Sequence, residues 1–309
     1  MSEARITRIR GPVLQARIDG TFRINEAVAI GDLGLLGEVL RLEGDRITVQ
    51  VYEDTTNLRP GSRVRGTGRQ LAVRLGPGVL GNIFDGLLRP LSGTGEAFIR
   101  PGIYQAQPLT FPFRPLVGTG ERLEGGRAFG RVEPRDARPQ PCLVPPGIVG
   151  EVTRVEEAGE YAEDAVLCRV RDETGVEHEL AMSHLWPVRR PRPLRRRLGL
   201  ERPLLTGQRI LDAMFPIARG STAAMPGGFG TGKTVLQQSL AKWSDADVIV
   251  YVGCGERGNE MTDVLREFPG LEDPRTGRPL MERSVIIANT SIMPVAAGEA
   301  SIYTGVTVA

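Results

Sequence analysis

The chain has little of several residue types, and each shortage excludes a class of protein. Its two histidines and three cysteines (Cys142, Cys168, Cys254) lack metal-ligand spacing, and the odd cysteine number argues against a disulfide framework, so a reducing cytoplasm fits. No apolar run approaches the roughly 18 residues that a membrane helix needs, and the amino-terminus has no signal-peptide core. A net charge of +2 gives no bulk attraction to nucleic acid or an anionic membrane. Any membrane association must therefore come through partners.

Lysine is also scarce: of 39 basic residues, only Lys233 and Lys242 are lysine. Lys233 belongs to a stretch, residues 227–234, that fits the pattern G-x-x-x-x-G-K-[ST]. Apolar residues 222–225 predict a strand before it, and residues 235–243 predict a helix after it. This is the context that a phosphate-binding loop requires, and the alternative is a glycine-rich turn that happens to contain Lys-Thr.

The residue types of this stretch suit a bound phosphate for physical reasons. Glycines let successive backbone N–H groups curl around phosphate oxygens, and the amino-terminus of the following helix adds partial positive charge. A lysine here reaches the terminal phosphates and the threonine hydroxyl holds Mg²⁺. We therefore predict a site for ATP and Mg²⁺, with Thr234 as the metal ligand. Its residues are Gly227, Gly228, Phe229, Gly230, Thr231, Gly232, Lys233, Thr234 and Val235.

Glu256 is the second chemical landmark. It follows the apolar run 247–253, which predicts a strand buried on both faces of a parallel sheet. Ligands of such sheets bind at the carboxyl ends of the strands, so a carboxylate there can polarise a water for attack on a γ-phosphate. Arg257 could meet phosphate charge or fix Glu256, and the alternative is a surface Glu-Arg pair in a turn. Cys254 is interpreted as a small buried residue rather than a nucleophile.

The remaining patterns predict a multidomain protein that is mostly β. Residues 1–68 form a small β-barrel, with a hairpin over 36–42 and 46–52. Residues 69–109 are a linker and the start of a central region, and residues 110–188 an inserted β-rich domain with strands at 149–155 and 165–170. Residues 189–309 form an α/β phosphate-loop (RecA-like) domain that also holds a helix at 206–216, a strand at 284–288 and a helix at 294–309, weakened by Gly298 and Gly305.

Two sets of basic residues receive structural interpretations. His178 and His184 have no ligand-rich surroundings, so we interpret both as structural residues. The arginine-rich run 189–197 lacks interleaved aromatics, which favours a solvated linker or partner-facing strip over a nucleic-acid patch.

One expected part is missing from the phosphate-loop domain. Hydrolases of this type use a strand ending in aspartate to hold Mg²⁺, but the strand at 247 leads into Glu256 and the strand at 284 into Asn289. Three predicted strands are also few for a doubly wound sheet. We therefore expect the chain to stop inside its nucleotide domain, and these 309 residues alone not to be a competent ATPase.

The sequence resembles a known family, the catalytic A subunit of V/A-type proton- or sodium-translocating ATPases. The resemblance runs along the whole chain. Its most specific stretches are GCGERGNEM (253–261) and QQSLAKWS (237–244), with further support from QVYEDT (50–55), GLLRPL (86–91) and HLWPVR (184–189). The β-rich region near 110–188 looks like the insertion that separates A subunits from their B partners and from the F-type β subunit.

The resemblance implies an ATP-hydrolysing or ATP-synthesising component of a rotary motor that uses ATP and Mg²⁺. It implies an alternating hexamer with B-type non-catalytic subunits, together with central and peripheral stalk subunits. The protein would lie in the cytoplasm, peripheral to a plasma membrane through these partners, and would not bind nucleic acid. Lys233 and Thr234 would bind phosphate and Mg²⁺, Glu256 would activate water, Arg257 would contact the γ-phosphate, and Phe229 would shape the loop.

Three departures from the family keep alternatives open. Gly228 stands where the family usually has proline, Gly298 where it commonly has arginine, and family chains run well beyond residue 309. One alternative is a nucleotide-binding but catalytically incomplete fragment. Another is a related hexameric ATPase, such as a secretion ATPase or an RNA translocase, although the insertion and the stretch 253–261 argue against it.

Overall fold

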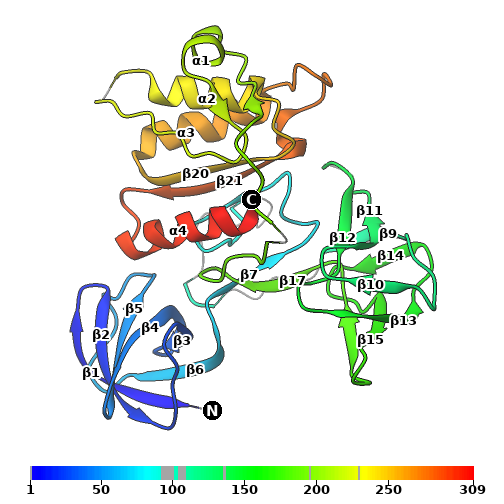
Figure 1. Cartoon of the computed structure of the whole chain (residues 1–309). Coiled ribbons are helices and arrows are strands. Elements are labelled where there is room, and N and C mark those ends of the chain that lie inside the picture. Colours follow the sequence, from blue (N-terminus) through cyan, green and yellow to red (C-terminus); the bar gives the residue numbers. More distant parts are fainter. Residues whose placement is uncertain (1, 92–100, 104–108, 135–136, 195, 229) are drawn as a thin grey trace.

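The computed structural model describes residues 2–91, 101–103, 109–134, 137–194, 196–228 and 230–309. Figure 1 shows three parts: a barrel at the amino-terminus, a β-rich unit, and an α/β unit that contains the carboxyl-terminus. The fold class predicted from the sequence is confirmed. The predicted loop residue Phe229 lies outside the described residues.

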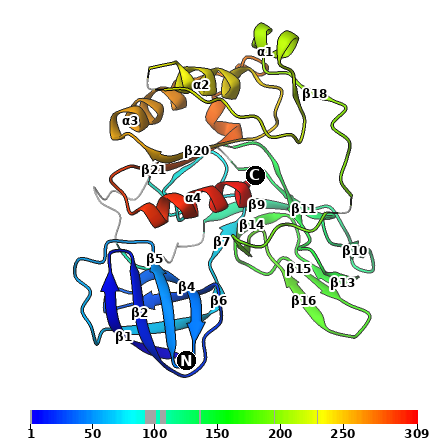
Figure 2. The same ribbon diagram turned by 60° about the vertical axis from the view of Figure 1, so that its left-hand side comes forward.

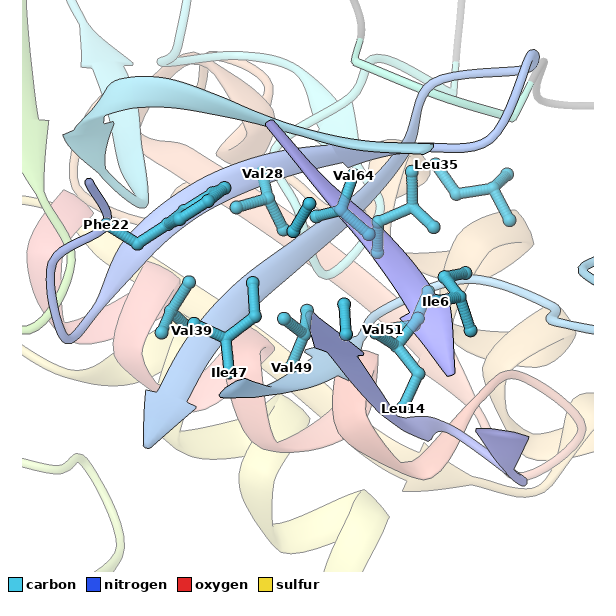
Figure 3. Packing of buried hydrophobic residues seen from close by; sticks show 13 residues of the cluster. Ile6, Leu14, Phe22, Val28, Leu35, Val39, Ile47, Val49, Val51 and Val64 are labelled. Atoms are coloured by element: carbon cyan, nitrogen blue, oxygen red, sulfur yellow. The ribbon is translucent and has the colours of Figure 1, made fainter. Parts of the chain in front are cut away.

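The amino-terminal part is a closed barrel with the strand order β1–β2–β5–β4–β3–β6. Alternating apolar residues point inward, and Figure 3 shows Val28, Ile47 and Val49 meeting in a core where all three are fully buried. The predicted hairpin is confirmed as the antiparallel pair β4 and β5. The strands are β1 (Glu3–Arg10), β2 (Val13–Asp19), β3 (Glu26–Ile30), β4 (Leu35–Glu43), β5 (Arg46–Val51) and β6 (Arg63–Gln70).

The β-rich unit consists of two four-stranded antiparallel sheets, β10–β13–β15–β16 and β12–β11–β9–β14. Leu123, Phe129 and Val170 are fully buried in its core. The predicted strand at 149–155 is confirmed, and the one predicted at 165–170 begins only at Cys168. The strands are β9 (Thr110–Pro115), β10 (Arg122–Glu124), β11 (Ala128–Val132), β12 (Gln140–Leu143), β13 (Val149–Val155), β14 (Gly159–Ala162), β15 (Cys168–Arg171) and β16 (Glu177–Leu180).

The segments before and after this unit return to the rest of the molecule. Strand β17 (His184–Pro187) pairs with β7 (Ala72–Leu75), which follows the barrel. Strand β8 (Ile83–Phe84) pairs in parallel with a strand of the α/β unit, a pairing that the sequence analysis did not predict. Residues 69–91 therefore contribute to the α/β sheet as well as linking domains, and the exact domain boundaries stay a prediction.

The α/β unit has a parallel three-stranded sheet with the order β20–β21–β8. In Figures 1 and 2, α4 lies on one face of this sheet, and α2 and α3 lie on the other. The elements are β18 (Pro203–Leu204), α1 (Arg209–Met214), β19 (Ile217–Ala218), α2 (Lys233–Trp243), β20 (Ile249–Glu256), α3 (Gly258–Glu267), η1 (Phe268–Gly270), η2 (Leu280–Arg283), β21 (Ser284–Thr290) and α4 (Val295–Val308). Among the described residues, no helix combines the length and apolar character needed to cross a membrane.

Two predictions about the strands of this unit need correction. The strand predicted at residues 222–225 is wrong: the segment is largely exposed and forms no strand. A strand persists only where a neighbour accepts its hydrogen bonds, and the described residues place none beside this segment. The strand predicted at 247–253 is confirmed as β20, but it is not buried on both faces. It lies at the edge of the sheet with β21 as its neighbour, and of its first five residues only Tyr251 and Gly253 are buried.

The described residues of the arginine-rich run are exposed, in line with a solvated linker or partner-facing strip, but its first residue also makes a specific ion pair that the sequence did not predict. Arg189 makes a bidentate ion pair with the fully buried Glu38 carboxylate, with Nε 2.8 Å from Oε1 and Nη2 2.9 Å from Oε2. The Tyr52 hydroxyl donates to the same carboxylate, and the Arg189 guanidinium lies 4.6 Å from the centre of the Tyr303 ring of α4. A bidentate arginine pair of this kind fixes orientation as well as charge. Arg189 thus ties the barrel to the α/β unit.

The two histidines have structural contacts, as predicted. His178 Nε2 lies 2.9 Å from an Asp172 carboxylate oxygen, and the His184 ring meets the Trp186 ring edge-on. Burial, helped by the charge of Arg192, lowers the pKa of His184 to about 4, so its ring is neutral at neutral pH. Within the described ranges, no group of three His, Cys, Asp or Glu side chains is placed to hold a metal ion.

Helix α4 forms despite its two glycines because both are buried against the sheet. A Cβ on Gly305 would lie 2.4 Å from Val252 Cγ2 of β20, well inside van der Waals contact. We expect Gly305→Ala to destabilise the protein by about 1–3 kcal/mol through overpacking, even though alanine is the better helix former by about 1 kcal/mol. Urea unfolding followed by circular dichroism measures the change.

Gly258 of α3 is the matched control for this prediction. It is also helical, but a Cβ there would meet nothing within 4 Å. Gly258→Ala should therefore leave the protein equally stable or stabilise it by up to about 1 kcal/mol. Equal effects of the two substitutions would show that propensity, and not the contact with Val252, decides the outcome at residue 305.

Candidate functional site

The phosphate loop curls immediately before α2. Gly230 and Gly232 have φ values of 74° and 80°, the left-handed region that glycine adopts without a steric penalty. Gly232 is the amino-terminal cap of α2 and supplies no side-chain cap, so the first-turn N–H groups of the helix point toward the loop. The glycines predicted from the sequence thus shape a loop whose amides and helix dipole favour an anion.

Lys233, the first residue of α2, turns its ammonium group back over the loop. Its Nζ donates to the carbonyl oxygen of Gly227 at 2.5 Å and to that of Gly228 at 3.2 Å. The Thr231 hydroxyl also donates to Gly228 O, at 2.8 Å, and closes the turn. An exposed positive side chain over a loop of glycines, next to an uncapped helix amino-terminus, fits a phosphate group. Thr234 is half-buried one residue further along, where its hydroxyl could hold Mg²⁺ beside that phosphate.

Glu256 stands at the carboxyl end of β20, where the strand leaves regular pairing. The register with β21 shifts between Cys254 and Glu256, and Gly255 takes a φ of 70° at this point. Ser291 N, just past the end of β21, donates to the Glu256 carbonyl at 2.8 Å. The two strand ends are therefore held together at the edge of the sheet where ligands of parallel sheets bind.

The carboxyl group of Glu256 has a perturbed pKa. Burial raises the pKa, a hydrogen bond and like charge from Glu260 raise it further, and the positive charge of Lys233 opposes them. The effect of Lys233 means that the lysine and the carboxylate, 23 residues apart in the sequence, lie within electrostatic reach of each other. A half-buried carboxylate whose pKa moves toward neutrality is suited to accept a proton from water.

Arg257 and Cys254 flank this carboxylate. Arg257 caps the amino-terminus of α3, with extended backbone angles and with its carbonyl accepting the Met261 N–H at 2.9 Å. The interpretation of Cys254 as buried is wrong: the residue is exposed near the end of β20, and its thiol lies 3.2 Å from the Gly298 carbonyl. The structure therefore places Glu256 at the carboxyl end of β20, where the charge of Lys233 acts on its pKa, with Arg257 directly after the carboxylate.

Sequence reasoning did not select two further polar residues at this edge. Glu260 lies in the first turn of α3, and its side chain is hydrogen-bonded to that of Glu256 at the end of β20. Because Glu256 lies outside the helix, no helical spacing in the sequence signals this pair. Thr290 ends β21, and its buried hydroxyl has no hydrogen-bond partner among the described residues. Its place opposite Glu256 follows from the rule that the ends of parallel strands meet at one edge.

A glycine-rich loop that opens a helix, beside a carboxylate at the end of a parallel strand, defines the phosphate-loop class of α/β proteins. Three family models match the chain. They are the beta-barrel domain of the ATP synthase alpha/beta family over residues 6–68, the ATPsynthase alpha/beta subunit barrel-sandwich domain over 106–189, and the nucleotide-binding domain of the ATP synthase alpha/beta family over 207–309. The chain belongs to the ATP synthase alpha/beta family.

Curated relatives agree with this assignment. The chain is 52% identical to the A subunit of the A-type ATP synthase of Methanopyrus kandleri over 98% of its own length and 52% of the relative. It is 51% identical to the V-type ATP synthase alpha chain of Halothermothrix orenii, again over 98% of this chain and 52% of the relative. The chain thus spans about half the length of these relatives, and the resemblance seen in the sequence is confirmed.

A solved structure supports the fold alone. The ATPase EscN of the type III secretion system of enteropathogenic E. coli covers 99% of this chain, and the match covers 52% of EscN, with a TM-score of 0.59 and 20% sequence identity. At this identity the likeness carries the arrangement of barrel and α/β unit, and it does not favour a secretion function for this chain.

Proposed function

We propose that the chain acts as the catalytic A subunit of a rotary V/A-type ATPase, which binds MgATP and couples its hydrolysis or synthesis to ion movement across a membrane. One observation carries the proposal: Lys233 closes a glycine loop that opens a helix, and Glu256 stands at the ligand-binding edge of the parallel sheet, in a chain about half identical to A-type subunits. The same two groups would be needed to hold the terminal phosphates and to activate water.

Each site residue has a proposed role at this edge. The loop from Gly227 to Val235, including Phe229, would enclose the phosphates with its N–H groups, and Lys233 would neutralise their charge. Thr234 would hold Mg²⁺, which supplies further positive charge to the phosphates when bound. Glu256 would accept the proton of the attacking water, and Arg257 would contact the γ-phosphate. The raised pKa of Glu256 supports its role as the base.

The proposed partners follow from the relatives, whose names are those of ATP synthase subunits. B-type subunits would alternate with this chain in a hexamer, and central and peripheral stalk subunits would connect the hexamer to a membrane. The chain itself would bind neither the membrane nor nucleic acid, consistent with its net charge of +2.

Co-expression with B-type subunits tests the proposal. We expect an alternating hexamer by native mass spectrometry, and Mg²⁺-dependent ATP hydrolysis when this chain is part of a subunit as long as its relatives, because the 309 residues alone are not expected to hydrolyse ATP. A chain that ignores B-type subunits, or an assembly that binds no MgATP, would contradict the proposed function. Assembly with MgATP binding but no turnover would instead favour the nucleotide-binding, catalytically incomplete alternative.

A further inference from the structure

Helix α2 connects the phosphate loop to a loop on the far side of the α/β unit. It runs from Lys233 to Trp243, and Ala241 is its one buried residue. Its eleven residues span about 16 Å, so a hydrogen-bonded helix joins the two ends. The position of this helix therefore depends little on apolar packing along its length. The hydrogen bonds at its carboxyl end contribute more to fixing it.

Arg283 donates hydrogen bonds to backbone carbonyls at and just beyond the carboxyl end of α2. Its Nη1 donates to Ala246 O at 2.7 Å, and its Nη2 lies 3.4 Å from Ala241 O and 3.5 Å from Lys242 O. The last carbonyls of a helix have no partner within the helix, and a cation is favoured there by the dipole. The Arg283 side chain is 2% exposed, so these bonds are shielded from water.

A carboxylate holds Arg283 in this position. Asp273 Oδ2 lies 2.8 Å from Arg283 Nε, in an ion pair that is not aligned as a hydrogen bond. Arg275 completes the cluster, because its backbone N–H donates to Asp273 Oδ1 and its Nη2 donates to Ala246 O at 3.0 Å. The planar guanidinium of Arg283 can reach several carbonyls at once, which a lysine ammonium cannot do in the same way.

The place of Arg283 in the chain connects this cluster to the rest of the site. Arg283 ends η2, and β21 begins at the next residue. The opposite end of β21 is held to Glu256 through Ser291 N. Strand β21 therefore has Arg283, which holds the end of α2, directly before its first residue, and Glu256 beside its last residue. Through this strand, Arg283 fixes the position of the phosphate loop relative to Glu256.

We propose that Arg283 is a positioning residue for the phosphate loop: it fixes the carboxyl end of α2 and thereby the place of Lys233 relative to Glu256. The effect on nucleotide affinity rests on the proposed function, whereas the effect on loop geometry does not. A hydrogen bond from a charged donor contributes about 1.5–3 kcal/mol to holding the folded geometry, so its loss weakens binding by up to about 10–100-fold where the loop needs that geometry to bind.

The test compares Arg283→Lys with Arg278→Lys in the whole chain. Arg278 has the same chemistry, but it pairs with Glu282 on the surface and its side chain is 57% exposed. MgADP is titrated into labelled protein, and the amide signals of Gly230 and Gly232 are followed by NMR, which also measures weak binding. We expect Arg283→Lys to shift these signals before nucleotide is added and to raise the dissociation constant about 10–100-fold, and Arg278→Lys to change neither.

Asp273→Asn is the second variant, in case Arg283→Lys does not fold. It keeps the guanidinium but removes its ionic partner, and we expect a smaller change in the same two measurements. Unchanged loop signals in a folded Arg283→Lys or Asp273→Asn protein would overturn the positioning role. A wild-type chain that binds no MgADP would contradict the nucleotide site instead, while the loop signals would still decide the role of Arg283.

Discussion

Lys233→Ala is expected to lower ATP hydrolysis by the assembly with B-type subunits by at least about 10²–10³-fold, the usual loss when a charged donor to the transition state is removed. The ammonium group lies over the phosphate loop, 2.5 Å from Gly227 O. The chain's other lysine, Lys242, lies at the far end of α2 and cannot replace it. Steady-state hydrolysis at saturating MgATP measures the loss.

Lys242→Ala is the control, because Lys242 is the chain's second lysine and lies in the last turn of the same helix. Its ammonium group lies 5.4 Å from the centre of the Trp243 ring, at the end of the helix opposite the phosphate loop. We expect nearly normal turnover in this variant. If Lys233→Ala also turned over normally, the phosphate loop would have to be sought elsewhere in the chain.

The loop and the carboxylate could be predicted from the sequence because both depend on local chemistry. The spacing of Gly227, Gly232 and Lys233 dictates a tight loop before a helix, and the apolar run before Glu256 dictates a parallel strand. Helix α2 and strand β20 form where these patterns place them. The pairing of β20 with β21 then puts Glu256 at the expected edge.

Features that depend on distant neighbours could not be predicted in this way. The two residues of β8 carry too little pattern to reveal a strand, and only their pairing with Ile286 and Ile287 makes them one. Residues 222–225 have an apolar pattern but no neighbouring strand among the described residues, so the pattern alone does not make a strand. The ion pair of Arg189 could not be predicted because its partner, Glu38, lies 151 residues away.

Glu256→Gln is expected to lower the rate of ATP hydrolysis by about 10²–10⁴-fold while ATP binding is largely kept. The amide has nearly the same shape as the carboxyl group and can still hydrogen bond with Glu260, but it cannot accept a proton from water. Turnover and the dissociation constant for MgATP, measured on the same assembly, separate the two effects. Equal losses of binding and turnover would make Glu256 a ligand-holding or structural residue.

Glu260→Gln provides the matched control and a test by pH. Because Glu260 helps to raise the pKa of Glu256, Glu256 keeps its proton to a higher pH than an ordinary glutamate and the base is lost as the pH falls through that raised value. Removing the charge of Glu260 should lower the pKa of Glu256, so the acid limb of the rate profile should move to lower pH with turnover at neutral pH largely kept. An acid limb that stays in place in Glu260→Gln, although Glu256→Gln abolishes turnover, would mean that another group sets the protonation of the base.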